Sequence, residues 1–415
     1  MSDWQGTQRQ HLFFTWSAQG PTQGFEVADA DGARFKAGDG RWRWDLESQV
    51  YNVNVGHKHP HVVERMKAQL DSIPACAPHA LLPIRAELAA KLCELTGMAR
   101  AFLACGGSEA VENAIKIARL YTGRSKVVTR RNSYHGATLS VLGIAGDRRK
   151  APFEKDLPAG LHIEDAWPPR APAEGRSSDW VESLEALVSR EGPESIAAIL
   201  LEGFTGTNGM QRPPADFWPR VRELCDAHGI LLIDDEIFSG FGRTGRTFAL
   251  EHWGVRADLM TLGKGLTSGY APLSGVMVSE AISRHFEDHP LVCGLTHYAH
   301  PVSCAAAMGS IEVLEREGLA ENAAAMGERF EAGFQSWRAD ARVGGHLVET
   351  RGLGLMRALV FDQPVAGLAR ALWEGGVFAP FRDNIIWVCP PLCIDAPGVD
   401  EVLAIFAERL PTAFE

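Results

Sequence analysis

The chain has 415 residues, more than a typical domain of about 100 to 200, so we expect one large domain or two closely associated ones. Hydrophobic residues make up 46% and charged residues 22%, a balance typical of a globular protein with a sizeable core. The net charge of -11 repels phosphate backbones, which argues against nucleic acid as a partner.

The N-terminal sequence and the cysteines narrow the class of protein further. The first residues have neither a basic segment nor a long apolar run, so they do not predict a signal peptide, and no stretch of 18 apolar residues predicts a membrane span. The eight cysteines are scattered, without the Cys/His spacing of a zinc site. We therefore predict reduced thiols, a cytoplasmic location and no metal.

The first 50 residues are rich in aromatic residues and glycine, which indicates an irregular arm followed by short strands at 25–27, 34–36 and 42–45. From about 100 to 280, strand and helix patterns alternate. Helices are expected at 108–121 and 216–228, and strands at 101–105, 126–129, 195–201, 230–233, 259–262 and 276–278. Because these strands are continuous apolar runs, we predict an α/β fold with a mostly parallel sheet that is covered on both faces.

Two further regions differ from this alternating part in composition or in the pattern of predicted elements. The segment 147–180 is rich in proline and charge and is interpreted as a surface excursion. After about 302 the sequence predicts a smaller α+β region, with helices at 302–316 and 319–337 and strands at 355–361 and 385–388. The expected organisation is an N-terminal arm with part of a small domain (1–55), a large domain (56–301) and a C-terminal small domain (302–415).

Three of the predicted strand ends carry polar residues: Glu202, Asp235 and Lys264. Ligands of doubly wound sheets bind at the carboxyl ends of strands. Lys264 lies between two glycines, where backbone can approach a ligand closely. A buried lysine has a depressed pKa and can form a Schiff base with an aldehyde, although a solvated lysine in a turn would have the same local sequence.

The other candidates supply what the aldehyde cofactor pyridoxal 5′-phosphate (PLP) needs. A carboxylate at Asp235 can keep a pyridine nitrogen protonated, while Ile237, on the same face of an extended segment, packs against the ring. The adjacent Asp234 is an equally acidic competitor. Gly107 and Ser108 open a helix whose N–H groups favour phosphate, although an ordinary N-cap serine would have the same sequence.

Two short motifs are weak when taken alone. Tyr134 and His135 follow a strand and offer a flat ring for stacking. The motif GFGRTG at 240–245 matches a dinucleotide-binding pattern. However, no long helix is predicted after it and it lies in mid-chain, so a nicotinamide cofactor is disfavoured.

Taken together, the motifs resemble the class III (ω) aminotransferases of PLP fold type I, whose fold is like that of aspartate aminotransferase. The resemblance covers nearly the whole chain. It is carried by residues 55–60 (VGHKHP), 106–110 (GGSEA), 134–136 (YHG), 231–237 (LLIDDEI), 240–245 (GFGRTG), 263–266 (GKGL), 296–301 (THYAHP), 351–356 (RGLGLM) and 390–392 (PPL).

The resemblance implies a role for each candidate. Lys264 forms the Schiff base and moves the proton, and Asp235 pairs with the pyridine nitrogen. The remaining cofactor contacts that it implies are Tyr134 and Ile237 on the two ring faces, His135 beside Tyr134, Gly107 and Ser108 at the phosphate, and Glu202 near the cofactor's hydroxyl. Thr296 is similar to a threonine that reaches the phosphate of a neighbouring subunit, which implies a homodimer, or a tetramer of dimers, with its active site at the interface.

Two departures bear on the substrate. Members that use glutamate and 2-oxoglutarate carry an arginine shortly before the PPL motif, where this chain has Trp387, and some carry a glutamate where it has Thr207. The stretches 15–19 and 265–273 look most like taurine–pyruvate-type members. The implied donor is therefore an ω-amino compound or amine such as taurine or β-alanine, with pyruvate as the 2-oxo acid acceptor.

Three side chains are candidates for substrate contact: Trp16, Tyr51 and Arg382. Arg382 can hold a carboxylate or sulfonate, or it can be a solvated loop residue. The two aromatics can line the donor pocket or belong to the core. The competing functions are a glutamate/2-oxoglutarate ω-aminotransferase of the 4-aminobutyrate or diamine type, a PLP aminomutase or decarboxylase, and a non-catalytic protein on the same scaffold.

Overall fold

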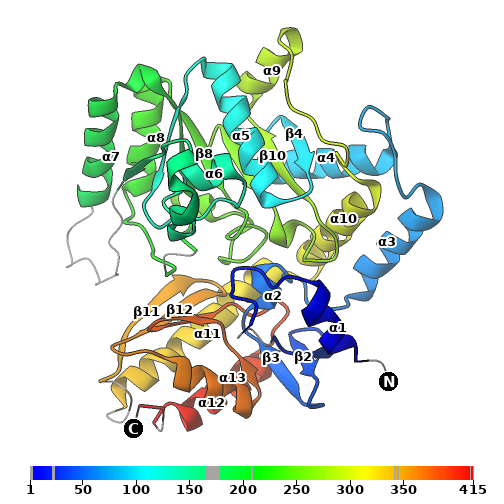
Figure 1. The fold of residues 1–415 in the computed structure, drawn as a ribbon, viewed down its shortest axis with the longest axis vertical. Helices are drawn as coiled ribbons and strands as arrows, with labels where there is room; N and C mark the ends of the chain where they lie inside the picture. The colour runs from blue at the N-terminus through cyan, green and yellow to red at the C-terminus, as the bar shows by residue number, and fades with distance from the viewer. Residues whose placement is uncertain are drawn as a thin grey trace.

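The computed structural model describes residues 3–20, 24–163, 178–206, 209–340, 343, 345–411 and 413–414. In Figure 1 a large α/β part lies above a smaller part built from both ends of the chain. The α/β class with a mostly parallel large sheet and a smaller sheet domain is confirmed. Among the described residues, no helix is both long and apolar enough to cross a membrane.

The large sheet has seven strands in the order β4-β10-β9-β8-β7-β5-β6. All of them run parallel except β10, which is antiparallel to both of its neighbours. The strands are β4 (Arg100–Ala104), β5 (Lys126–Arg130), β6 (Leu161–Ile163), β7 (Ile196–Glu202), β8 (Leu231–Asp235), β9 (Leu259–Leu262) and β10 (Ser274–Val278).

Both faces of this sheet are covered, which explains why its strands are apolar throughout. Along β7, Ala198 and Leu200 pack into the cluster that includes α5 (Gly107–Thr122). The alternate residues Ile199 and Leu201 pack into the cluster on the other face. That face is covered by α7 (Ser178–Glu191) and α8 (Phe217–His228), as Figure 1 shows.

The large part also contains further helices and short 3-10 turns among its described residues. They are α3 (Pro60–Ser72), α4 (Pro83–Thr96), α6 (Leu139–Ile144), α9 (Glu280–Asp288) and α10 (Pro301–Arg316), with 3-10 turns η1 (Arg148–Asp156), η2 (Pro193–Ser195), η3 (Ala249–Trp253) and η4 (Lys264–Leu266). The helix α10 packs along α3 and α4. Its small residues are almost all buried, so the helices approach closely.

The small part joins segments from opposite ends of the chain. One sheet has the order β1-β2-β3-β13, in which β3 pairs in parallel with β13, and the other is the antiparallel sheet β11-β12-β15-β14. Their strands are β1 (Val27–Asp31), β2 (Arg34–Ala37), β3 (Trp42–Asp45), β11 (Leu347–Leu353), β12 (Met356–Phe361), β13 (Val377–Phe378), β14 (Phe381–Arg382) and β15 (Ile385–Val388). The helices are α2 (Ser48–Tyr51), α11 (Leu319–Ala339), α12 (Ala366–Gly375) and α13 (Ala396–Arg409).

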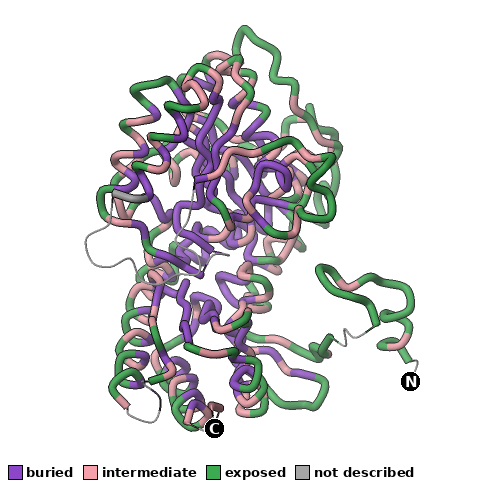
Figure 2. Tube along the Cα trace, turned by 60° about the vertical axis from the view of Figure 1, so that its left-hand side comes forward, coloured by how far each residue is buried: buried purple, intermediate pink, exposed green. Residues whose placement is uncertain are grey.

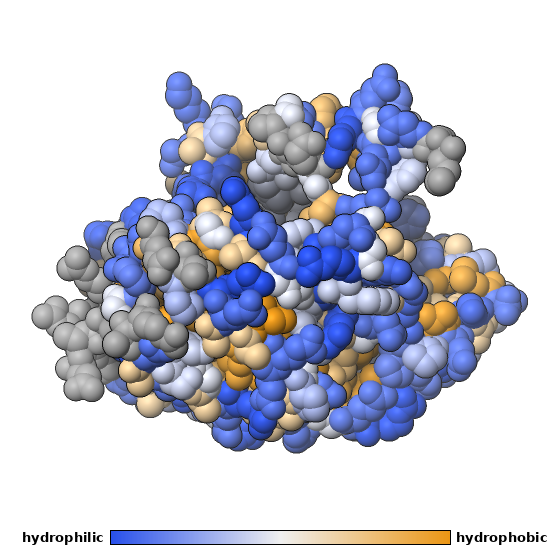
Figure 3. Space-filling view, turned by 90° about the horizontal axis from the view of Figure 1, so that it is seen from below, coloured by the Kyte–Doolittle hydropathy of each residue, from blue (hydrophilic) through white to orange (hydrophobic). Residues whose placement is uncertain are grey.

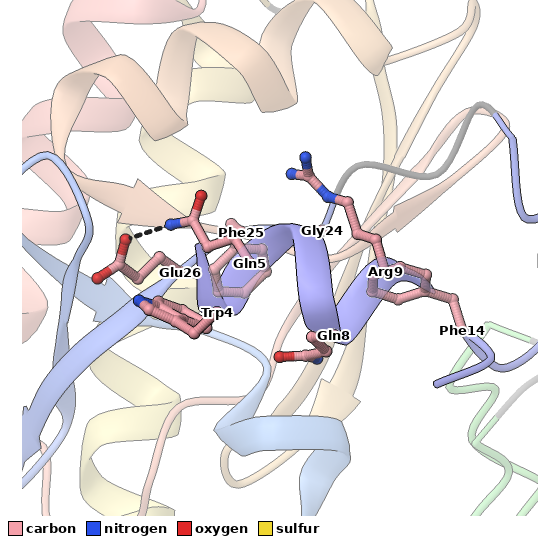
Figure 4. A pocket seen from close by; sticks show the side chains of 8 residues that line it. All are labelled: Trp4, Gln5, Gln8, Arg9, Phe14, Gly24, Phe25 and Glu26. Carbon is pink, nitrogen blue, oxygen red and sulfur yellow. Dashed lines mark hydrogen bonds between the residues drawn. The ribbon is translucent and has the colours of Figure 1, made fainter. Parts of the chain in front are cut away.

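The N-terminal arm is exposed along most of its length, as the green tube in Figure 2 shows. Its helix α1 (Trp4–His11) has no buried residue. It encloses a small cavity of about 100 Å³ against residues 24–26, where the Gln5 amide donates a hydrogen bond of 2.7 Å to Glu26 (Figure 4). The expected irregular arm therefore contains a short helix.

Most of the expected elements are present within a residue or two of their predicted bounds. The interpretation of 147–180 as a surface excursion is wrong in part. Leu161–Ile163 forms the edge strand of the large sheet, where Val128 pairs with Leu161, and residues 164–177 lie outside the described part of the chain. The domain boundaries near 55 and 301 stay a prediction.

Candidate active site

The carboxyl ends of β7, β8 and β9 meet at one edge of the large sheet. Glu202 pairs in register with Asp235, and Asp235 pairs with Thr261. Lys264 follows β9 after one glycine. The parallel strands therefore bring together the three polar strand ends, which lie far apart in the sequence.

Lys264 has the features of a reactive amine. Its φ is 41°, in the left-handed region that residues with a Cβ rarely adopt. Burial lowers its pKa, although the carboxylates of Asp235 and Glu202 act in the opposite direction. Its Nζ lies 4.7 Å from the ring centroid of Phe238. A desolvated lysine of this kind has a larger neutral, nucleophilic fraction than an exposed one.

Asp235 is held firmly by its neighbours. Its Oδ2 lies 2.7 Å from Nδ1 of His135, and its Oδ1 accepts hydrogen bonds from the Thr261 hydroxyl at 2.9 Å and from the Ile237 N–H at 3.1 Å. The competitor Asp234 belongs to the opposite face of β8, since it lies against Glu236 and Gly203. Of the two aspartates, Asp235 therefore shares an electrostatic environment with Lys264.

Glu202 and His135 carry polar atoms that are buried without a partner among the described residues. Oε2 of Glu202 accepts the Gly206 N–H at 2.7 Å, but Oε1 has no partner, and neither does Nε2 of His135. Burial raises the pKa of Glu202. Buried polar atoms are nearly always paired in native proteins, so these atoms indicate a site for a polar ligand.

The start of α5 has open backbone N–H groups at the predicted phosphate contacts, whose role stays a prediction. The N-cap is Gly106, and within the described chain no acceptor is assigned to the N–H groups of Gly107 and Ser108. The hydroxyl of Ser108 accepts the Ala137 N–H at 2.9 Å. A Cβ added at Gly136, whose φ is 152°, would lie 2.7 Å from this hydroxyl, so only glycine allows the approach.

The two residues expected at the ring faces flank the same region. Ile237 packs against Gly107 and Gly263, with its side-chain atoms 3.1 and 3.3 Å from the positions where their Cβ atoms would lie. Arg149 Cζ lies 3.8 Å from the Tyr134 ring centroid. The guanidinium of Arg149 therefore covers one face of the Tyr134 ring.

Thr296 is not brought to the phosphate site of its own subunit by any contact among the described residues. It is exposed, and the carbonyl of its neighbour His297 lies 3.8 Å from the Cys105 thiol. The segment therefore lies beside the start of α5, and Thr296 is exposed there.

All three predicted substrate residues line one cavity of about 460 Å³ beside this site. Five further lining residues were not predicted from the sequence, namely Asp147, Arg148, Arg149, Gly206 and Phe238. The complete lining is Trp16, Tyr51, Asp147, Arg148, Arg149, Gly206, Phe238, Arg382 and Trp387. The paired arginines at 148 and 149 were the available signal, but their charge was interpreted as that of a solvated surface segment.

A left-handed turn presents Tyr51 to this cavity. The four consecutive residues of α2 have φ between 48° and 64°, although none is glycine. The turn is anchored by the Ser48 hydroxyl, which donates to the Cys389 carbonyl at 2.5 Å and accepts from the buried Arg243 at 3.3 Å. Each such residue costs about 1 to 3 kcal/mol, and strain of this kind is concentrated at functional sites.

Comparisons with known proteins agree with this geometry. Residues 17–410 match the family model of class-III aminotransferases. The acetylornithine aminotransferase of Archaeoglobus fulgidus is 32% identical over 97% of this chain and 99% of its own length. The 5-aminovalerate aminotransferase of Pseudomonas putida is 34% identical over 89% of each chain. The solved taurine:2-oxoglutarate aminotransferase from Bifidobacterium kashiwanohense, bound to PLP and glutamate, has a TM-score of 0.91 and 32% identity, covering 97% of this chain and 96% of its own.

The chain is a class III aminotransferase. The fold of this aminotransferase is therefore PLP fold type I, and its cofactor is pyridoxal 5′-phosphate. The residues present fit that cofactor, because the site combines a desolvated lysine, a buried carboxylate, unpaired buried polar atoms and open backbone N–H groups at a helix start. Its substrates are an amine donor and a 2-oxo acid.

Proposed function

We propose that this aminotransferase takes the amino group from an ω-amino compound that carries an acidic group, such as taurine or β-alanine, and transfers it to pyruvate. The observation that carries the proposal is the charge of the cavity next to Lys264. Three guanidinium groups (Arg148, Arg149 and Arg382) line it, against the single carboxylate of Asp147. A cavity with excess positive charge favours a carboxylate or sulfonate.

In this proposal, Lys264 would hold the cofactor covalently until the donor's amino group displaces it, and the freed Lys264 amine would then carry the proton. When bound, PLP withdraws electrons from the carbon that bears the amino group. In its neutral form, Lys264 would take the proton from that carbon and deliver it to the cofactor's former aldehyde carbon. Asp235 keeps the pyridine nitrogen protonated, and His135 holds the carboxylate in place through the 2.7 Å contact.

The other cofactor contacts are proposals of the same kind. Gly107 and Ser108 hold the phosphate, Tyr134 and Ile237 enclose the ring, and Glu202 lies at the hydroxyl side. What supports them is their position around one sheet edge.

The acceptor is proposed from Trp387. This residue lies in β15, lines the cavity, and is only 9% exposed, with its indole Nε1 unpaired among the described residues. The resemblance places the arginine of glutamate-using members at this position, and an indole cannot replace its two parallel hydrogen bonds to a carboxylate. Thr207, the second departure, lies outside the described residues.

A second candidate is an enzyme that uses 2-oxoglutarate. The same three arginines favour it, since they offer alternative partners for the distal carboxylate of a dicarboxylic acid. The similar solved structure is also that of a taurine aminotransferase that uses 2-oxoglutarate. The two candidates share a donor class and differ in the acceptor.

A donor and acceptor panel tests the proposal. Taurine, β-alanine, putrescine, 1-phenylethylamine and ornithine are each incubated with pyruvate or 2-oxoglutarate, and alanine and glutamate are quantified. We expect alanine from taurine or β-alanine. A clear preference for 2-oxoglutarate would select the second candidate, and consumption of the amine without an amino acid product would contradict transamination of these donors.

We further propose a homodimer, or a tetramer of dimers, in which Thr296 reaches the phosphate of the neighbouring subunit. Large apolar side chains are exposed on the single chain, including Leu81 at 98% and Val292 at 66%. In Figure 3 hydrophobic side chains gather at the right-hand edge, the side on which α3 lies in Figure 1. Extended apolar surface of this kind supports an interface with a second copy.

A cytoplasmic location is proposed as well. The eight cysteines are all unpaired, which is typical of proteins in a reducing compartment.

A further inference from the structure

We infer that Arg149 binds the carboxylate or sulfonate of the amine donor through the edge of its guanidinium that the protein leaves open. This inference rests on the proposed function and names a residue that recognises the acidic end of the donor. It is carried by the contacts that hold Arg149 at the wall of the cavity.

One edge of the Arg149 guanidinium is occupied by Asp147. Nε donates to Oδ1 at 2.7 Å and Nη2 donates to Oδ2 at 2.8 Å, which is a bidentate pair. A guanidinium has five N–H donors, so three remain on Nη1 and Nη2. Among the described residues, no acceptor is assigned to these three donors. Since Arg149 lines the cavity, the open edge is available to a ligand there.

Two aromatic rings fix the plane of the same guanidinium. Its Cζ lies 3.8 Å from the ring centroid of Tyr134 and 4.7 Å from that of Trp16. The two rings are perpendicular to each other, at 88°, with centroids 6.1 Å apart. Cation–π contacts of this kind restrict the guanidinium to a narrow set of orientations, so little further ordering is needed when an anion binds.

Asp147 is itself held in place and acts as a positioning residue. It is the N-cap of η1, where its Oδ1 also accepts the Arg149 N–H at 2.8 Å. It is 6% exposed, whereas the Arg149 side chain is 30% exposed. Although burial acts in the opposite direction, the hydrogen bonds from Arg149 lower the pKa of Asp147, so the carboxylate stays ionised. The protein thus supplies one carboxylate to orient Arg149, and the substrate supplies the other.

The remaining cations of the cavity differ from Arg149 in their surroundings. Arg148 is exposed, and Arg382 lies 5.6 Å from the ring centroid of Trp387. Burial and the neighbouring Arg148 lower the pKa of Arg382. Arg149 combines a bidentate contact to a carboxylate with contacts to two aromatic rings.

The test compares acidic and neutral donors in the PLP-loaded enzyme. We expect Arg149→Gln to raise KM for β-alanine and taurine by about 10- to 100-fold, the effect of losing a hydrogen-bonded charge, with kcat changed less than about threefold. Propylamine, which lacks the acid, should keep its KM. Arg149→Lys retains the charge but not the two-donor edge, and we expect it to recover only part of the loss.

Binding is also measured without turnover. Ethanesulfonate and propanoate have no amino group, so their affinity for the PLP-loaded enzyme is obtained by calorimetry, with propanamide as the neutral probe. Arg149→Gln should weaken both anions about 10-fold or more and leave propanamide unchanged. Asp147→Asn should produce a smaller loss, because Arg149 is retained but no longer oriented.

The matched control is Arg284→Gln, which removes a surface arginine that donates to Glu280 at 2.7 Å. This variant should change neither the KM values nor the anion affinities. Equal losses for acidic and neutral donors in Arg149→Gln, or unchanged anion affinity, would overturn the inference. If wild-type enzyme fails to react with acidic donors but binds ethanesulfonate through Arg149, the donor proposal fails and the anion site stands. If acidic donors react with the same kinetics in Arg149→Gln as in the wild type, the donor proposal stands and the anion site at Arg149 fails.

Discussion

Nδ1 of His135 lies 2.7 Å from Oδ2 of Asp235, and both side chains are almost completely buried. The two residues are a hundred positions apart in the sequence, and the loop after β5 brings them together behind the sheet edge. The contact uses one oxygen of Asp235, while Thr261 and Ile237 donate to the other. Asp235 is therefore oriented before any cofactor arrives.

This arrangement predicts unequal effects of two substitutions. Asp235→Asn should lower kcat by about 100-fold or more, because a neutral amide cannot stabilise a protonated pyridine nitrogen. His135→Gln should lower it by only about 3- to 10-fold, since Thr261 and Ile237 still hold the carboxylate. Steady-state kinetics and the visible spectrum of the bound cofactor measure both. Equal losses would show that His135 acts in another way.

Replacing the proposed Schiff-base lysine should abolish covalent attachment of the cofactor. We expect Lys264→Ala to reduce transamination by at least about 1000-fold, because both the covalent link and the proton carrier are lost. Borohydride treatment followed by mass spectrometry should show a stable cofactor adduct in the wild type only. Lys116→Ala, at an exposed position of α5, is the control and should retain the adduct. An adduct that persists in Lys264→Ala would assign the role to another lysine.

The acceptor preference should depend on position 387. We expect Trp387→Arg to raise kcat/KM for 2-oxoglutarate relative to pyruvate by about 10-fold or more, since a guanidinium supplies the bidentate contact that indole lacks. Trp387→Phe keeps an apolar ring and should leave the ratio nearly unchanged. Competition between the two acceptors, read as alanine against glutamate formed, gives the ratio directly. A wild-type enzyme that already prefers 2-oxoglutarate would refute the argument from Trp387.

The turn that carries Tyr51 predicts a pH dependence of stability. Burial, together with the charge of Asp45, raises the pKa of Glu47 from 4.5 to about 7. The native state therefore binds the Glu47 carboxyl proton more tightly than the unfolded state does. The stabilisation that protonated Glu47 adds to the free energy of unfolding is fully present below about pH 4.5 and is lost as the pH rises through 7. The resistance of the apoenzyme to urea should therefore fall between pH 5 and pH 8.

Between pH 5 and pH 8, the free energy of unfolding of Glu47→Gln should fall by about 1 to 3 kcal/mol less than that of the wild type. Glutamine keeps the shape of the side chain but does not titrate. The exposed Glu64→Gln is the control and should follow the wild-type curve. If Glu47→Gln shows the same loss between pH 5 and pH 8 as the wild type, another group is responsible.

The proposed dimer predicts an effect of a charge at Leu81. This side chain is 98% exposed on the single chain, and a carboxylate buried at an interface without a partner is strongly unfavourable. Leu81→Glu should shift the species seen by light scattering towards the monomer at micromolar concentration. Val348→Glu, at a position of β11 that is 53% exposed, should leave the mass unchanged. A wild-type monomer would contradict the interface itself.

The sequence by itself determined the fold class, the cofactor and the candidates for its anchoring. These depend on local patterns, namely short apolar runs that indicate buried strands, glycines at a helix start and a lysine shortly after a strand, together with the family resemblance that the motifs carry. Lys264, Asp235 and the start of α5 could be named because each belongs to a short motif whose chemistry is set by adjacent residues.

Only the tertiary structure decided which residues share the substrate cavity. Trp16, Tyr51, Arg149 and Arg382 come from the arm, a left-handed turn, η1 and β14, and nothing local in the sequence relates them. The tertiary structure also distinguished Asp235, which lies on the Lys264 side of β8, from Asp234 on the opposite side. The direction of each side chain depends on the register of β8 against its neighbours. The sequence also does not reveal that Arg148 and Arg149, in the charge-rich segment after Asp147, line the cavity. Whether an arginine faces water or a cavity depends on packing between distant segments, which sequence periodicity does not record.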